Sequence, residues 1–158
     1  MQKITPFLWF DNNAQEAIQF YTSVFKNSRT GISSNQTDDT PGPTGEFMVG
    51  KFYLNGQEFM ALNGGPTFHF TEAISLVVNC EDQEEVDYFW DKLISGGGAP
   101  SQCGWLKDKF GLSWQIVPTA LGELMASKDK SASQRAMAAL MKMTKIDIKQ
   151  LEDAAKGI

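Results

Sequence analysis

The chain has 158 residues, a formal net charge of -5 and 42% hydrophobic residues, an ordinary globular composition for one or two small domains. Lysine and arginine form no basic stripe, which argues against nucleic acid as a partner. No stretch approaches the roughly 20 apolar residues that span a bilayer, so we expect no membrane partner.

Residues 1–7 contain no extended apolar segment of the kind that directs export. The two cysteines, Cys80 and Cys103, suggest no disulfide framework. Without an export signal, reduced thiols are the expected state. We therefore expect a cytoplasmic protein.

The first half of the chain predicts one strand, one helix and three further strands. The apolar run at the start is typical of a buried strand, and the next segment places apolar residues at helical spacing. Asn55-Gly56 is a strong hairpin signal, and the polar Pro/Gly segment 37–45 predicts an exposed loop. The expected elements are a strand at 4–10, a helix at 14–25, and strands at 30–36, 47–54 and 58–62.

The second half predicts the same order of elements. Glu81-Asp82 begins the helix, and the glycines 96–98 end it. The turn 108–111 precedes a last strand in which apolar and polar residues alternate. The expected elements are a strand at 73–78, a helix at 81–95, a short strand region at 101–107, and a strand at 112–117.

The two halves form an internal repeat. The helix segment 15–21 recurs 68 positions later (15 to 83) as 83–89. Gly56 and Gly111 open the last strands at an offset of 55 (56 to 111). Each half therefore reads strand–helix–strand–strand–strand, and we expect an α+β fold in which the two halves form one curved mixed sheet. We place a single domain at 1–130, with halves at about 1–65 and 70–120, and a helical extension at 131–158.

The extension predicts two helices, one over 132–143 and one that starts at Asp147. Asp147 is a candidate N-cap with Gln150 at the reciprocal position. Met137 and Met141 share a face of the first helix, and methionine-rich faces suit both cores and interfaces. The extension can pack on its own domain or form a contact between subunits, and the sequence leaves both open.

Five segments of the chain suggest a known family: I-T-P-F-L-W-F, A-I-Q-F-Y, A-I-S-L-V-V-N-C, Q-C-G-W-L-K-D-K-F-G-L-S-W-Q-I-V-P and M-K-M-T-K-I-D-I. In these segments the chain resembles the PhnB-like branch of the vicinal oxygen chelate superfamily, which includes glyoxalase I, bleomycin-resistance proteins and extradiol dioxygenases. The branch often carries the label 3-demethylubiquinone 3-methyltransferase. The resemblance implies paired βαβββ modules, the glyoxalase/bleomycin resistance/dioxygenase fold, and a homodimer.

Metal-dependent members of this superfamily place their ligands on the first and last strands of each module. The equivalent positions here are Thr5, Met60, Ala73 and Gln115. These side chains cannot hold a catalytic divalent ion, which needs carboxylates or imidazoles. A slip of one residue would bring in Glu72 but would also turn the apolar face outward. The lone histidine, His69, lies between the modules, so we expect no metal and no other cofactor.

Strand parity assigns the side chains that face the concave side of the sheet. Aromatic and polar groups on such a surface are typical of a site for a small-molecule ligand. The candidate ligand-binding residues are Phe7, Trp9, Glu58, Met60, Ser75, Trp105, Ser113 and Gln115. Gln115 either orients a polar group of a ligand or bonds to a neighbour such as Ser113, Ser75 or Thr5.

Three further residues have competing interpretations. Trp114 faces the helix and is expected in the core, and Asp108 is expected to cap the hairpin turn rather than act as a base. Cys103 is a small packed residue or, if a nearby cation lowers its pKa, a reactive thiol. The packed state is the simpler expectation for this cysteine.

The sequence favours a metal-independent protein that binds a small molecule and forms a homodimer. One alternative is an enzyme of the same superfamily, a lyase, isomerase or dioxygenase-like protein. Another is the methyltransferase of the family label. The glycines 96–98 end a helix rather than open one, so the Gly-rich turn of a Rossmann-type cofactor site is missing.

Overall fold

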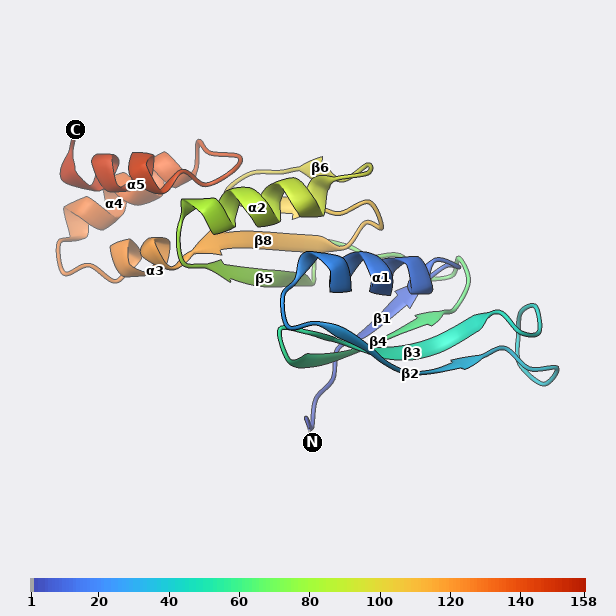
Figure 1. The fold of residues 1–158 in the computed structure, drawn as a ribbon. Coiled ribbons are helices and arrows are strands. Elements are labelled where there is room, and N and C mark those ends of the chain that lie inside the picture. Colours follow the sequence, from blue (N-terminus) through green and yellow to red (C-terminus); the bar gives the residue numbers. More distant parts are fainter. Residues whose placement is uncertain (1) are drawn as a thin grey trace. The chain divides into compact units, whose positions relative to one another are not determined.

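The computed structural model describes residues 2–158 as two compact units, with the boundary between Phe70 and Thr71. Both units contain one strand, one helix and three more strands in the same order (Figure 1). This repetition confirms the two βαβββ modules predicted from the sequence. The predicted mixed sheet is present as two four-stranded sheets, one in each unit.

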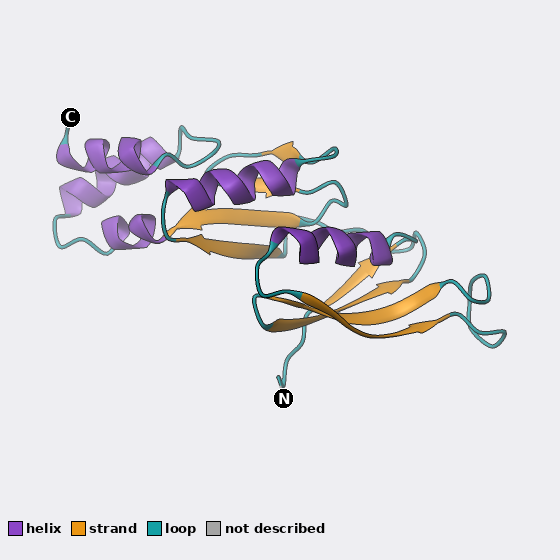
Figure 2. Cartoon of the chain, in the orientation of Figure 1, coloured by secondary structure: helices purple, strands orange, loops and turns teal. Residues whose placement is uncertain are grey.

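In the first unit, one helix covers one face of a mixed sheet (Figure 2). Strand β1 pairs in parallel with β4, the remaining pairs are antiparallel, and the strand order is β1-β4-β3-β2. The helix buries Tyr21, which stacks on Phe52 of the sheet. The elements are β1 (Phe7–Phe10), α1 (Ala14–Val24), β2 (Arg29–Asn35), β3 (Phe47–Leu54) and β4 (Gln57–Asn63).

The start of α1 is held by the last residue of β4, which pairs with the end of β1. Asn13, which precedes the helix, makes no side-chain cap, whereas the Asn63 carboxamide oxygen accepts from the Ala14 N–H at 2.8 Å. The Asn63 amide also donates to the Phe47 carbonyl at 3.0 Å. Asn63 therefore satisfies one of the free N–H groups at the helix start and ties α1 to β3.

In the second unit the strand order is β5-β8-β7-β6, again with the first and last strands parallel. Asp82 caps α2 by accepting from the Glu85 N–H at 2.9 Å, as the sequence indicated. The helix buries Val86, Trp90 and Leu93. The elements are β5 (Ser75–Cys80), α2 (Gln83–Ile94), β6 (Ala99–Pro100), β7 (Trp105–Lys107) and β8 (Ser113–Pro118).

The last hairpins of the two units have turns of different length. Asn55 and Gly56 form a two-residue turn with φ angles of 47° and 82°, the left-handed geometry of a type I′ hairpin. In the second unit Lys107 pairs with Ser113, so residues 108–112 form a longer turn. The length of a hairpin turn sets the register of the strands that it joins.

This difference corrects one equivalence expected from the sequence. The alignment of Gly56 with Gly111 made Gln115 the counterpart of Met60. In the structure Phe7 pairs with Met60, whereas Ser75, the repeat counterpart of Phe7, pairs with Ser113. Ser113 therefore occupies the position of Met60. The correction is two residues (115 to 113), an even number, so each side chain stays on its predicted face.

Of the expected strand region 101–107, only 105–107 form a strand, β7, and the short strand β6 lies before that region. Residues 102–104 leave the sheet between β6 and β7, and both Cys103 and Gly104 have positive φ angles, 57° and 83°. A Cβ on Gly104 would lie 2.8 Å from the Ile116 carbonyl oxygen, so glycine allows the backbones to approach closely here. The alternation of polar and apolar residues did not indicate this turn.

Three helices follow the second sheet, one more than the sequence predicted: α3 (Thr119–Met125), α4 (Lys130–Leu140) and α5 (Ile148–Lys156). The Gln83 side chain of α2 donates to the Ile146 carbonyl at 3.1 Å and accepts from the Ile148 N–H at 2.9 Å. Ile146 and Leu151 are buried in one apolar cluster, with partly buried Cys103 packed against it. These helices therefore pack on their own unit.

None of the helices in the described part of the chain, residues 2–158, is long and apolar enough to cross a membrane.

Candidate functional site

The face of each sheet opposite its helix carries all eight residues predicted to bind a ligand. In β1 the buried Leu8 and Phe10 point to the helix, whereas Phe7 is 55% exposed on the other side. The same alternation holds in β4, β5, β7 and β8. Phe7, Trp9, Glu58 and Met60 share the open face of the first unit, and Ser75, Trp105, Ser113 and Gln115 share that of the second.

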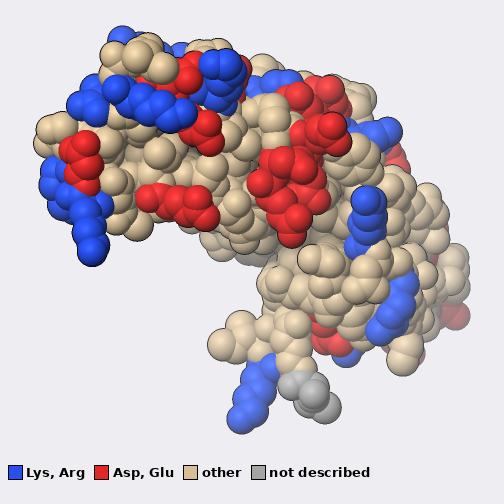
Figure 3. Space-filling view, turned by 60° about the vertical axis from the view of Figure 1, so that its left-hand side comes forward, with Lys and Arg blue, Asp and Glu red and all other residues tan. Residues whose placement is uncertain are grey.

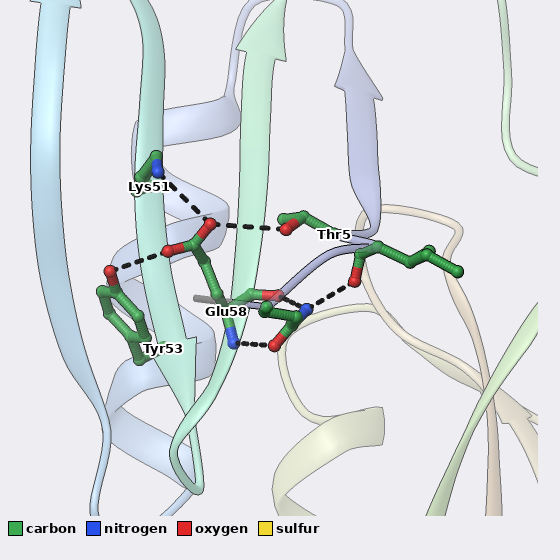
Figure 4. Close-up of polar contacts among 6 residues, drawn as sticks. Thr5, Lys51, Tyr53 and Glu58 are labelled. Carbon is green, nitrogen blue, oxygen red and sulfur yellow. Dashed lines mark hydrogen bonds and ion pairs between the residues drawn. The ribbon is translucent and has the colours of Figure 1, made fainter.

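On the open face of the first unit, Glu58 is the centre of a polar network (Figure 4). Its Oε2 accepts from the Tyr53 hydroxyl at 2.9 Å. Its Oε1 accepts from Lys51 Nζ at 3.2 Å and from the Thr5 hydroxyl at 3.3 Å. The Glu58 backbone N–H also donates to the side-chain oxygen of Gln2 at 3.1 Å. Both carboxylate oxygens are therefore occupied by donors.

These donors stabilise the charged form of Glu58. The Tyr53 hydroxyl first, and Lys51 after it, lower the pKa of the Glu58 carboxyl below its usual value of 4.5. The Arg29 guanidinium lies 3.6 Å from the centre of the Tyr53 ring, a cation–π geometry. The cluster thus holds two cations and one anion, although the chain as a whole is acidic.

Trp9, a predicted ligand contact, is anchored within its own unit. Its indole N–H donates to the Gly65 carbonyl at 2.9 Å, and its ring meets Phe68 edge-on at 5.0 Å between centroids. A Cβ on Gly64 would lie 2.3 Å from the indole, so the ring fits only because residue 64 has no side chain. The indole N–H of Trp9 is therefore already bonded to Gly65, and only the apolar surface of the ring is available for a further contact.

The open face of the second unit is arranged in two rows across β7, β8 and β5. Lys107 lies opposite Ser113, which lies opposite Ser75. Trp105 lies opposite Gln115 in the next row. Paired side chains on one face of a sheet have Cβ atoms about 4.5–5.5 Å apart, so each row forms a continuous group.

Gln115 bonds to a neighbour, one of the alternatives that the sequence left open. Its Nε2 donates to the Ser75 hydroxyl at 2.8 Å, a diagonal contact between the two rows. The bond leaves the carboxamide oxygen of Gln115 as a further acceptor. Gln115 is therefore held in one orientation before any ligand arrives.

A hollow of about 220 Å³ lies beside these rows at the β6–β7 edge of the sheet. Its wall includes Trp105, Lys107, Ser113 and Glu72, and Glu72 forms an ion pair with Lys107. Ser113 is only 1% exposed, and its hydroxyl has no hydrogen-bond partner among the described residues 2–158. A buried hydroxyl without a partner is costly and uncommon in a native fold.

Sequence reasoning missed several participants on these faces, among them Lys51, Tyr53 and Lys107. All three lie on inner strands, β3 or β7, and their side chains point to the same face as those of the predicted site residues. Lys51 pairs with Met60 and Tyr53 pairs with Glu58. Extending the parity argument to the third strand of each module would have identified them.

The side chains on these faces do not fit the metal that the superfamily resemblance implies. No group of three His, Cys, Asp or Glu within residues 2–158 could hold an ion. The Thr5 hydroxyl donates to Glu58, and Ala73, which precedes β5, has no side-chain donor atom. The Met60 thioether and the Thr5 and Ser113 hydroxyls, even with the nearby Gln115 amide, are a poor set for hard or borderline divalent cations.

The site of a Rossmann-type methyl donor does not fit either. Such a site needs a Gly-rich turn from a strand into a helix, with phosphate or ribose groups at the helix start. Here β1 connects to α1 through Asp11, Asn12 and Asn13. Gly98 lies after α2, where a Cβ would approach the Lys107 carbonyl to 2.7 Å, so glycine is needed there for packing.

Asp108 and the two cysteines have structural environments. Asp108 is 3% exposed and accepts from the Phe110 and Leu112 N–H groups at 2.9 and 3.1 Å, which confirms its predicted role in the turn. Burial, followed by the nearby Glu85 and Asp82, raises the pKa of Cys80 to about 12. Cys103 is half-buried, with its Sγ 3.9 Å from Met141 Sδ.

The surface charges are mixed on the face of the molecule shown in Figure 3. Lysine and arginine side chains form separate groups there, and aspartate and glutamate lie between them. That face therefore presents no continuous basic stripe for a nucleic acid backbone.

Comparisons with known proteins place this fold and these motifs in one family. The sequence model of the family described as 3-demethylubiquinone-9 3-methyltransferase matches residues 2–117, which leaves α3, α4 and α5 outside the match. None of the curated proteins searched is significantly similar to the chain.

Several solved structures are similar to the chain. The PhnB protein of Bacillus cereus is 41% identical, with a TM-score of 0.68 over 74% of this chain and 99% of its own. A protein from Pseudomonas aeruginosa is 19% identical, with a TM-score of 0.61 over 75% of this chain and 98% of its own. A fosfomycin resistance protein from Listeria monocytogenes, solved with Mn(II) and sulfate, is 14% identical, with a TM-score of 0.52 over 75% of this chain and 91% of its own.

The last two structures show the shared fold alone, whereas the family match and the B. cereus protein identify the branch. The paired βαβββ modules, the match over residues 2–117 and the 41% identity together show that this chain belongs to the PhnB-like 3-demethylubiquinone-9 3-methyltransferase family.

Proposed function

We propose that this protein binds a small organic molecule on the open faces of its sheets and needs no metal to do so. The observation that carries the proposal is the Ser113 hydroxyl, which is buried without a partner in the wall of a hollow. Native folds rarely leave such a group unsatisfied, and a ligand atom is one way to satisfy it.

Three further features of the second unit support a ligand at this position. Trp105 gives the hollow an aromatic wall, and Lys107 supplies a cation. Gln115 is oriented by its bond to Ser75 in the adjoining rows. An apolar surface with a few fixed polar groups is the usual composition of a small-molecule site.

The same proposal gives Glu58 a binding role rather than a metal-ligating one. Its two oxygens already accept from Tyr53, Lys51 and Thr5, and a ligated metal would have to displace these donors. The network fixes Lys51 on the open face next to the exposed Phe7 row. A ligand on this face would meet an apolar surface beside a positioned ammonium.

A homodimer is part of this proposal. Phe7 and Val77, on the open faces, are 55% and 50% exposed, and Met141, after α4, is 64% exposed. Size-exclusion chromatography with light scattering measures whether the protein is a dimer. The same measurement on Met141→Lys tests whether the C-terminal helices contribute to the subunit contact. A dimer that survives Met141→Lys unchanged would remove Met141 from the contact.

A thermal-shift screen of small organic acids, phenols and amides in the presence of EDTA tests the proposed function. We expect a subset of compounds to raise the melting temperature of the wild-type protein, since a ligand that binds only the folded state stabilises it. Ser113→Ala should reduce these shifts, whereas Ser34→Ala, a matched change on the exposed strand β2, should leave them unchanged. Shifts that appear only when Zn, Ni, Mn or Fe is added would contradict the proposal.

A further inference from the structure

We propose that the hollow of the second unit takes a small planar carboxylic acid, whose carboxylate displaces Glu72 from Lys107 and bonds to Ser113. This inference rests on the proposed function and specifies the ligand class and the group that must move. Lys107 and Ser113 are direct neighbours across β7 and β8, on the same face of the sheet. Their side chains are therefore close enough for one carboxylate to contact both.

The Glu72–Lys107 ion pair is the part of this wall that can open. The side chains of Glu72 and Lys107 are 63% and 42% exposed. Glu72 precedes β5, outside the hydrogen-bonded strands, whereas Lys107 is fixed in β7. Exposed ion pairs contribute little to stability, so a competing carboxylate can replace Glu72 at small cost.

Glu72 resembles the expected ligand in its chemistry. It already presents a carboxylate to Lys107, and this contact lowers the pKa of the Glu72 carboxyl below its usual value. A ligand that exchanges with it still places one carboxylate against the Lys107 ammonium. The ligand gains the hydrogen bond with the buried Ser113 hydroxyl, which has no partner within residues 2–158.

The size and walls of the hollow restrict the rest of the ligand. Its volume of about 220 Å³ is below the roughly 300–1,000 Å³ of sites for drug-sized molecules, so a single ring with one acidic group is a suitable size. Trp105 and Pro100 provide apolar surface for the ring. A dianion such as a phosphate ester is disfavoured, because Lys107 is the one cation in the wall among residues 2–158 and the displaced Glu72 stays nearby.

Benzoate and benzamide are matched probes for this inference, because they share a ring and differ in charge. We expect calorimetric titration at low ionic strength to give benzoate an affinity about tenfold or more above that of benzamide, since charged hydrogen bonds are stronger than neutral ones. Lys107→Met should remove this preference. Glu72→Gln should tighten benzoate about threefold and leave benzamide unchanged, because the competing carboxylate is gone.

The outcomes separate this inference from the proposed function. Equal binding of benzoate and benzamide, or a benzoate affinity that Glu72→Gln does not raise, would overturn the carboxylate exchange while leaving small-molecule binding in place. If benzoate does not bind while other compounds raise the melting temperature in EDTA, the carboxylate exchange is also overturned and small-molecule binding stays in place. Failure of every compound in EDTA would overturn both. Circular dichroism and melting temperature show whether each variant is folded, and the exposed Glu72→Gln is the variant least able to disturb the core.

Discussion

The Trp114 indole N–H donates to the Asp108 carboxylate at 2.8 Å, and both residues are almost fully buried, at 2% and 3% exposure. The contact joins the turn 108–112 to the helix-covered core of the second unit. It supports the turn whose length sets the register that puts Lys107 opposite Ser113. The candidate site on one face of the sheet therefore depends on a hydrogen bond on the other.

Replacing Asp108 by alanine should destabilise the protein by about 2–4 kcal/mol, because three donors in and near the core lose their charged acceptor. Urea denaturation followed by tryptophan fluorescence measures the change. Asp91→Ala, which removes an exposed aspartate from α2, is the matched control and should cost little. A loss for Asp108→Ala no larger than that of the control would show that the turn does not depend on this carboxylate.

Gly64→Ala should move Trp9 out of its position, because the new Cβ would lie 2.3 Å from the indole ring. We expect a loss of about 1–3 kcal/mol, typical of overpacking. The tryptophan emission should also change, and this change should vanish in a Trp9→Phe background. Gly122→Ala is the control, since nothing lies within 4 Å of its Cβ position in α3. An unchanged spectrum for Gly64→Ala would contradict the packing described here.

The stability that Glu58 contributes should depend on pH. Its pKa is lowered in the folded state, chiefly by the Tyr53 hydroxyl, so the unfolded chain binds the proton more readily. The contribution is complete above the unfolded value of 4.5 and is lost as the pH falls through the lower, folded value. The stability gap between wild type and Glu58→Gln should therefore shrink between about pH 7 and pH 3. A gap that stays constant over this range would mean that the network does not favour the charged form.

Gln115 and Ser75 should be energetically coupled. Gln115→Leu leaves the Ser75 hydroxyl without its donor, so a double-mutant cycle with Ser75→Ala should give a coupling of about 0.5–1.5 kcal/mol. If Gln115 also contacts a ligand, the compounds found by thermal shift should bind Gln115→Leu more weakly. Additive effects of the two substitutions on stability would show that the hydrogen bond is not maintained in solution.

Much of the fold could be predicted because the signals were local. The Asn55-Gly56 turn, the Asp82 and Asp147 caps and the burial of Trp114 follow from residue type and spacing within a few positions. The faces of the site residues were equally predictable, because side chains alternate along a strand whatever its partner.

The register and the contacts between distant segments could not be read in this way. Gly111 resembles Gly56 as a turn glycine, yet it ends a longer turn, and only the pairing of Ser75 with Ser113 reveals the difference. The bonds of Glu58 to Tyr53 and Lys51 follow from the register that the Asn55-Gly56 turn sets, whereas the bond from Thr5 to Glu58 joins segments 53 positions apart. Helix α3 was missed because it is short and buries none of its residues.

Native mass spectrometry of tag-free protein, before and after incubation with EDTA, tests metal-independent binding most directly. We expect subunits without bound metal that carry an organic adduct, retained in EDTA and diminished in Ser113→Ala. One Zn, Ni, Mn or Fe ion per subunit, with the adduct lost when EDTA removes the metal, would contradict the account and make the protein a metal-dependent member of its superfamily.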